Sequence, residues 1–220
     1  MKPTSKTETQ SSTAGSDGPN HAGNDRFGLD RLIFFSDAVF AIAITLLALD
    51  INLPQADENI SSAELWTMLA SLRHDYSAYV TSFVVIGIFW LGHHAKFRSI
   101  ARYDRTMIWL NLLLLMTVAF LPFPTRVMSD YFNSAATIFY AVTVSFAGIL
   151  TVLINFYAVH NNRLVDSDTP LHKHMQRPWR LFIVPLIFLL SIPIAIYEPM
   201  LARYFWLLLI PLEMLKANDV

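Results

Sequence analysis

Five long stretches of this chain carry almost no charged residue, and they constrain its fold more than any other feature. Residues 32–49 hold one charge, Asp37, and residues 76–95, 106–125, 131–159 and 181–197 hold none. A helix that crosses a bilayer needs about 20 mostly apolar residues. The first four stretches reach that length and the fifth nearly does. Because only helices or closed barrels satisfy their backbone in lipid, the sequence predicts an all-α integral membrane protein.

A sixth apolar stretch, residues 204–212, is short, so residues 181–215 could form one overlong helix or a hairpin of two. Glu198-Pro199 lies between the two halves, and a residue before proline is disfavoured in helical conformation. We therefore expect a hairpin, which gives six transmembrane helices per subunit. Pro122-Phe123-Pro124, at the end of the third stretch, predicts a rigid exit from that helix.

The polar N-terminal segment predicts the domain organisation, and the distribution of basic residues predicts the orientation in the membrane. Residues 1–26 are rich in Ser, Thr, Gly and Asn and lack aromatic residues, which predicts a disordered tail before a six-helix domain over residues 27–216. With both termini cytoplasmic, 13 of the 16 Lys and Arg residues lie inside, and only Arg73, Arg126 and Arg203 lie outside. In the first outer loop, Ser61-x-x-Glu64 is a capping-box pattern and predicts a short helix.

Composition argues against several classes of function. The net charge of −1 shows no basic excess, so we expect no nucleic-acid partner. The absence of cysteine removes thiolate metal sites and cysteine nucleophiles. His160, His172 and His174 fall in a polar loop and are a weak metal pattern, so we expect no metal there. Without a phosphate-binding loop or a nucleophile motif, we expect no cofactor, no catalytic residues and no enzyme activity.

The first apolar stretch carries two functional signals. Asp37 lies about 9 Å along the helix from Arg31, at 1.5 Å per residue, and a charge within a span is costly unless it is paired or functional. It could pin neighbouring helices together or bind a cation. Four residues spaced i, i+3, i+4 and i+7 share one side of the helix and are called here the Ile42 face: Ile42, Thr45, Leu46 and Leu49. Taken alone, such a face is more typical of packing than of a pore.

Polar residues of three stretches fall at a similar depth near the cytoplasmic side. An unpaired polar group is expensive in hydrocarbon, so we expect a network between helices. For His93 and His94, a position at the helix end near water remains the alternative. The candidate members of the network are Ser36, Asp37, Trp90, His93, His94, Trp109 and Asn111.

The motif Arg31-x-x-x-Phe35-Ser36-Asp37 and the residues that follow it resemble the first helix of the transmembrane protein 175 family, the endosomal and lysosomal potassium channels. The segments 90–94 (WLGHH), 109–113 (WLNLL) and 120–125 (FLPFPT) continue the resemblance. It therefore covers the chain from about residue 27 to its C-terminus.

The resemblance implies a homotetramer of six-helix subunits in a prokaryotic inner membrane, with the first helix lining a central pore. The motif residues Arg31, Phe35, Ser36 and Asp37 would join the network between helices, and Ile42 would form the main constriction. Thr45, Leu46 and Leu49 would line the pore beside it. The implied function is a potassium-permeable cation channel, also passing other monovalent cations, whose hydrophobic neck gates by dewetting.

Two rival functions remain open at this level. A proton-coupled transporter could use Asp37 and His94, although the sequence lacks a second clear acid within a span. A closed, tightly packed tetramer would serve only as a membrane scaffold. Single-channel currents would exclude both rivals.

Overall fold

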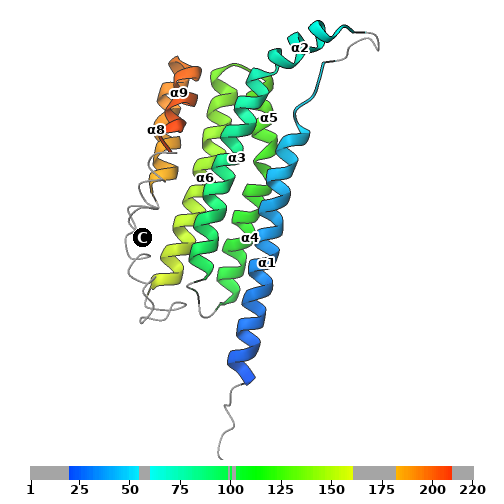
Figure 1. The fold of residues 1–220 in the computed structure, drawn as a ribbon. Helices are drawn as coiled ribbons and strands as arrows, with labels where there is room; N and C mark the ends of the chain where they lie inside the picture. Colours follow the sequence, from blue (N-terminus) through cyan, green and yellow to red (C-terminus); the bar gives the residue numbers. More distant parts are fainter. Residues whose placement is uncertain (1–19, 55–59, 99, 101–102, 161–181, 210–220) are drawn as a thin grey trace, which may run out of the picture.

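A computed structural model describes residues 20–54, 60–98, 100, 103–160 and 182–209. The described residues form a bundle of long helices that lie side by side (Figure 1). The long helices are α1 (Asn20–Leu49), α3 (Arg73–Phe97), α4 (Arg105–Phe120), which leads directly into α5 (Pro122–Asp130), and α6 (Ser134–Val159). The shorter elements are α2 (Ser62–Ser71), α8 (Ile183–Tyr197), α9 (Pro199–Phe205) and the 3-10 helix η3 (Trp206–Leu208).

Four segments of the described residues are long and apolar enough to cross a membrane: Gly28–Leu49, Arg73–Phe97, Arg105–Asp130 and Ser134–Val159. They match the first four apolar stretches of the sequence. The fifth apolar helix, Ile183–Tyr197, is shorter. The prediction of an all-α integral membrane protein is therefore confirmed.

The last described helices, α8 and α9, are separated by a break at the expected position and lie at the edge of the bundle (Figure 1). Helix α8 ends at Tyr197, and α9 begins at Pro199 after the non-helical Glu198. Trp206 returns along α8, where its Nε1 donates a hydrogen bond to Ser191 Oγ at 2.9 Å. Its ring lies 5.0 Å from that of Phe188. The remainder of the sixth apolar stretch, from residue 210, lies outside the described residues.

The predicted helix exit at Pro122-Phe123-Pro124 is wrong, because the chain stays helical through it. Leu121 keeps helical angles, φ −54° and ψ −34°, and α5 continues to Asp130. Thr125 N–H still donates to the Leu121 carbonyl at 3.1 Å. Proline is tolerated at the start of a helix, where its missing N–H has no partner to lose. The third span therefore continues into a second helical segment instead of ending.

The helical structure also starts earlier than the sequence indicates. Helix α1 begins at Asn20, before the boundary at residue 26 that was expected to end a disordered tail. Once a span is helical, each preceding residue adds a backbone hydrogen bond without a new nucleation cost. Residues 1–19, His172 and His174 lie outside the described residues, whereas His160 ends α6 as its C-terminal cap.

The short helix expected in the first outer loop is confirmed as α2. Ser61 N–H donates to Glu64 Oε2 at 2.8 Å, and Glu64 N–H donates to Ser61 Oγ at 3.3 Å, which completes the capping box. The Ser61 backbone bond, and next the Ser61 side-chain bond, hold the pKa of Glu64 below its usual 4.5. In Figure 1, α2 lies beyond the C-terminal end of α1.

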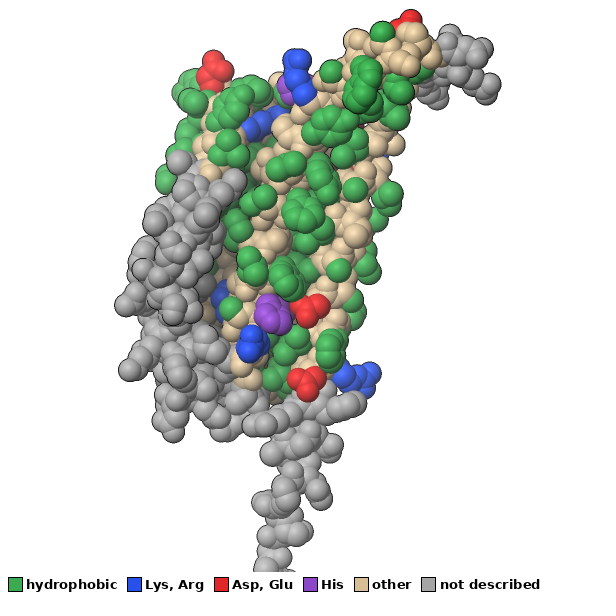
Figure 2. Space-filling model, viewed as in Figure 1, with side chains coloured by type: hydrophobic (Ala, Val, Ile, Leu, Met, Phe, Trp, Pro, Cys, Tyr) green, Lys and Arg blue, Asp and Glu red, His purple; other side chains and the backbone are tan. Residues whose placement is uncertain are grey.

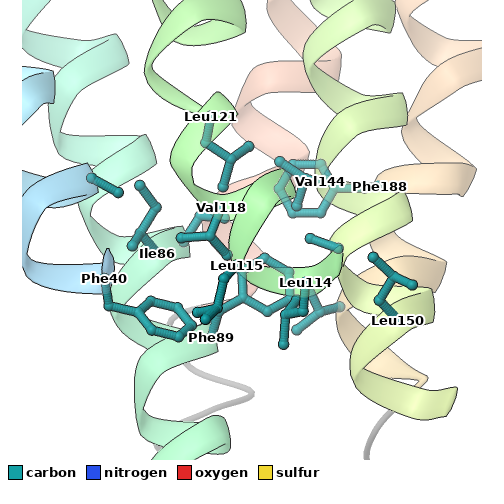
Figure 3. Close-up of a cluster of buried hydrophobic side chains, with 14 of the residues drawn as sticks. Phe40, Ile86, Phe89, Leu114, Leu115, Val118, Leu121, Val144, Leu150 and Phe188 are labelled. Atoms are coloured by element: carbon teal, nitrogen blue, oxygen red, sulfur yellow. The ribbon is translucent and has the colours of Figure 1, made fainter. Parts of the chain in front are cut away.

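An apolar core joins the helices. Buried side chains from α1, α3, α4, α6 and α8 interdigitate there (Figure 3). Gly148 allows α6 and α8 to approach closely, since an added Cβ would lie 2.9 Å from Pro185 of α8. Burial of such side chains and close contact at small residues are what hold a helical bundle together. The labelled core members are Phe40, Ile86, Phe89, Leu114, Leu115, Val118, Leu121, Val144, Leu150 and Phe188.

Candidate functional site

Helix α1 has two apolar sides with opposite surroundings. One side packs into the bundle and is called here the buried seam: Ser36, Phe40, Ala43 and Leu47, each at most 1% exposed. The Ile42 face lies elsewhere on the helix and is not covered by the described residues. Ile42 is 57% exposed and Leu49 73%, and Thr45 and Leu46 are also exposed. The space-filling view shows similarly apolar side chains across the visible face of the bundle (Figure 2).

Thr45 is the one residue of the Ile42 face with a polar side chain. Its Oγ1 donates to the Ile42 carbonyl at 2.8 Å, one turn earlier in the same helix. With the hydroxyl proton directed to the backbone, the oxygen lone pairs are left facing outward. The Ile42 face can therefore offer an oxygen ligand between aliphatic side chains, but no charge.

Behind α1, a hydrogen-bonded chain joins three helices. Ser36 Oγ donates to the Leu32 carbonyl at 2.8 Å, and Asn111 Nδ2 of α4 donates to Ser36 Oγ at 3.0 Å. Asn111 Oδ1 lies 2.8 Å from His93 Nε2 of α3. Ser36, Asn111 and His93 are each at most 2% exposed. The chain fixes the position of α1 against α3 and α4.

The direction of these bonds indicates the tautomer of His93. Because the Asn111 amide nitrogen donates to Ser36, its oxygen must accept, so the proton of a neutral His93 lies on Nε2. His93 Nδ1 has no hydrogen-bond partner among the described residues. The ring instead stacks on Phe97, with centroids 4.1 Å apart, and lies 5.4 Å from Phe40.

Asp37 forms a second link between α1 and α3. Its Oδ1 accepts a hydrogen bond from Trp90 Nε1 at 2.9 Å. The ring of His94 lies 5.7 Å from that of Trp90, and His94 Nδ1 has no partner among the described residues. Asp37 is therefore placed as a carboxylate that joins helices.

Other predicted members are not brought into this arrangement. Trp109 is 66% exposed and points away from Asn111, because two residues correspond to about 200° around a helix. Arg31 and Phe35 are exposed on α1. They border an open hollow of about 420 Å³, with Gly28, Leu32, Tyr103 and Ile108 as its other lining residues.

Sequence reasoning missed further polar contacts that join helices among the described residues. Ser82 Oγ lies 2.8 Å from Thr125 Oγ1 and 3.0 Å from the Tyr140 hydroxyl, which ties α3 to α5 and α6. A small hydroxyl side chain barely changes the hydropathy of a span, so the charge pattern gave no signal for it. Near the C-terminal end of α3, Lys96 Nζ donates to the Thr151 carbonyl at 3.4 Å, and just before α4 the Tyr157 hydroxyl donates to Asp104 Oδ2 at 2.5 Å.

Comparison with known proteins identifies the family of this chain. Residues 31–122 match the model of the endosomal/lysosomal potassium channel TMEM175. A potassium channel of Chamaesiphon minutus is 36% identical over 148 residues, which cover 65% of this chain and 72% of that protein. The chain belongs to the TMEM175 family. A crystal structure of a lysosomal potassium-selective channel TMEM175 homolog from the same organism has a TM-score of 0.75 at 30% identity, covering 87% of this chain and 98% of the other.

Relatives in the TMEM175 family differ in length and in name. A potassium channel of Streptomyces collinus is 46% identical over 123 residues, covering 53% of this chain but only 58% of that protein. The chicken relative, named an endosomal/lysosomal proton channel, is 32% identical over 148 residues that cover 30% of its length. The expected resemblance is therefore confirmed. The region that matches the family model, residues 31–122, contains α1 from Arg31 onward, with the Ile42 face, and all of the hydrogen-bonded residues that join α1 to α3 and α4.

Proposed function

We propose that this chain forms a homotetrameric, potassium-permeable cation channel with six spans per subunit and both termini cytoplasmic, in a prokaryotic inner membrane. Ions pass along a central pore lined by α1. The names of the bacterial relatives support a potassium channel over a proton-coupled carrier. The excess of Lys and Arg in one set of loops supports the orientation.

The observation that carries the proposal is the exposure of the Ile42 face. Helix α1 lies at one edge of the bundle (Figure 1), where an apolar side is covered either by lipid or by another copy of the chain. Here α1 buries one seam and leaves Ile42, Leu46 and Leu49 exposed among the described residues. In a tetramer, four copies of this face around a central axis would together form the lining of one pore.

The chemistry of the Ile42 face suits passive cation conduction. Four Ile42 side chains form a hydrophobic neck, which stops ions when it dewets. Four Thr45 hydroxyl oxygens replace part of the hydration shell of a cation just beyond the neck. The face contains no basic residue to repel cations. Such a neutral neck discriminates among monovalent cations by size and dehydration.

The polar layer behind α1 holds this face in place. The Ser36–Asn111–His93 chain and the Asp37–Trp90 bond both fasten α1 to its neighbours at the cytoplasmic end. Because these bonds turn inward, Asp37 acts in the network and not as an ion ligand in the pore.

A flux assay on purified protein in liposomes tests the proposed function. Potassium, sodium and proton fluxes are measured separately across the same vesicles. We expect potassium flux without a saturable, proton-driven component, and increased or less selective flux for Ile42→Asn and Ile42→Ala. No cation flux from the wild type, with no effect of either Ile42 variant, contradicts a channel. Substrate uptake that requires a pH gradient would favour the carrier.

A further inference from the structure

At the outer end of the bundle, one arginine is shared between two carboxylates. Arg126 Nη1 of α5 lies 3.5 Å from Asp50 Oδ1, and Arg126 Nε lies 3.5 Å from Asp130 Oδ2, one turn further along α5. Asp50 directly follows Leu49, the last residue of both α1 and the Ile42 face. The Arg126–Asp50 ion pair thus joins the end of α1 to α5.

The position of this pair gives it access to the ion path. The Asp50 side chain is 27% exposed and that of Arg126 is 49% exposed, so both charges reach water. If α1 surrounds the axis, four Asp50 carboxylates lie around the outer mouth, each facing its own Arg126. An exposed ion pair of this kind contributes little to folding stability, so its charge matters more than its bond.

We propose that Arg126 sets the electrostatic potential at the outer mouth by partly neutralising Asp50, and so limits the rate at which cations enter the pore. This inference rests on the proposed function. A carboxylate at the mouth of a pathway raises the local cation concentration, and a guanidinium beside it cancels part of that effect. Arg126 is thus a residue that tunes permeation without touching the neck.

The test is single-channel recording at two potassium concentrations, with potassium entering from the outer side. Arg126→Gln should raise inward conductance about twofold at about 10 mM, where the Debye length is ~30 Å. The difference should vanish at about 1 M, where the Debye length is ~3 Å. Asp50→Asn should lower inward conductance at the low concentration by a similar factor and be silent at the high one.

Two further variants separate charge from structure. Arg126→Lys keeps the cation and should conduct like the wild type. Glu198→Gln removes an exposed outer carboxylate at the α8–α9 turn, on the side of the subunit opposite α1 in Figure 1, and should change nothing. The inference is overturned if Arg126→Gln equals the wild type at low concentration, if its effect persists at 1 M, or if Arg126→Lys has the same effect. A wild type without current overturns the proposed function as well, whereas these other results leave it intact.

Discussion

Asn111 is the residue whose removal should most clearly expose the role of the polar layer. It is fully buried and bonds at once to Ser36, at 3.0 Å, and to His93, at 2.8 Å. Asn111→Ala removes both bonds and leaves a buried imidazole N–H without an acceptor. Hydrogen bonds between helices in membrane proteins average ~0.6 kcal/mol and reach ~1.7 kcal/mol. Two such bonds predict a loss of about 1.2 to 3.4 kcal/mol in the free energy of unfolding.

The loss can be measured by reversible unfolding in mixed detergent micelles, followed by far-ultraviolet circular dichroism. Trp109→Leu is the matched control, because Trp109 lies two residues away on the same helix but is 66% exposed and bonds to no member of the network. A double-mutant cycle of Ser36→Ala with Asn111→Ala should give a coupling of about 0.6 to 1.7 kcal/mol. The reasoning fails if Asn111→Ala costs no more than Trp109→Leu, or if the cycle shows no coupling.

Two other predictions concern separate parts of the fold. Gly148→Ala should destabilise the packing of α6 on α8, because the new Cβ would lie 2.9 Å from Pro185. Gly87→Ala should be neutral or stabilising, because a Cβ there would meet nothing within 4 Å, and the melting temperatures of the two variants test this difference. The low pKa of Glu64 means that its contribution to α2 is complete above pH 4.5 and is lost as the pH falls through the folded-state pKa. Hydrogen exchange in α2 should therefore accelerate on acidification, and Glu64→Gln should remove that dependence; equal acid sensitivity in both proteins would contradict it.

The sequence predicts depth along the membrane better than direction around a helix. Positions of polar residues along the spans place Ser36, Asn111 and His93 in one layer, and they do form a bonded chain. The same reasoning placed Trp109 beside them, but depth does not distinguish opposite sides of α4. A period of 3.6 residues turns Trp109 outward when Asn111 points inward.

Patterns of residues close together in the sequence predict helix ends correctly but fail within the third span. The Ser61–Glu64 capping box and the break at Glu198 were both predictable, since each depends on residues close together in sequence. The Pro122 segment was misjudged because a proline that opens a helical turn costs little when the preceding residue stays helical. The contacts of Ser82 with Thr125 and Tyr140 depend on three helices meeting, and no local pattern encodes such a meeting.

For the Ile42 face, the spacing predicts a shared side of α1, and the structure leaves that side exposed. Which neighbours cover it depends on other copies of the chain, so its role as a pore lining stays a prediction.

The most direct test of the pore assignment exploits the absence of cysteine from the chain. A single cysteine replaces either Leu49, on the Ile42 face, or Leu47, on the buried seam, and channel currents are recorded while a charged thiol reagent is applied from the outer side. The account predicts that Leu49→Cys channels are blocked and that Leu47→Cys and wild-type channels are unaffected. Block of Leu47→Cys alone, or of neither variant, would contradict a pore lined by the Ile42 face.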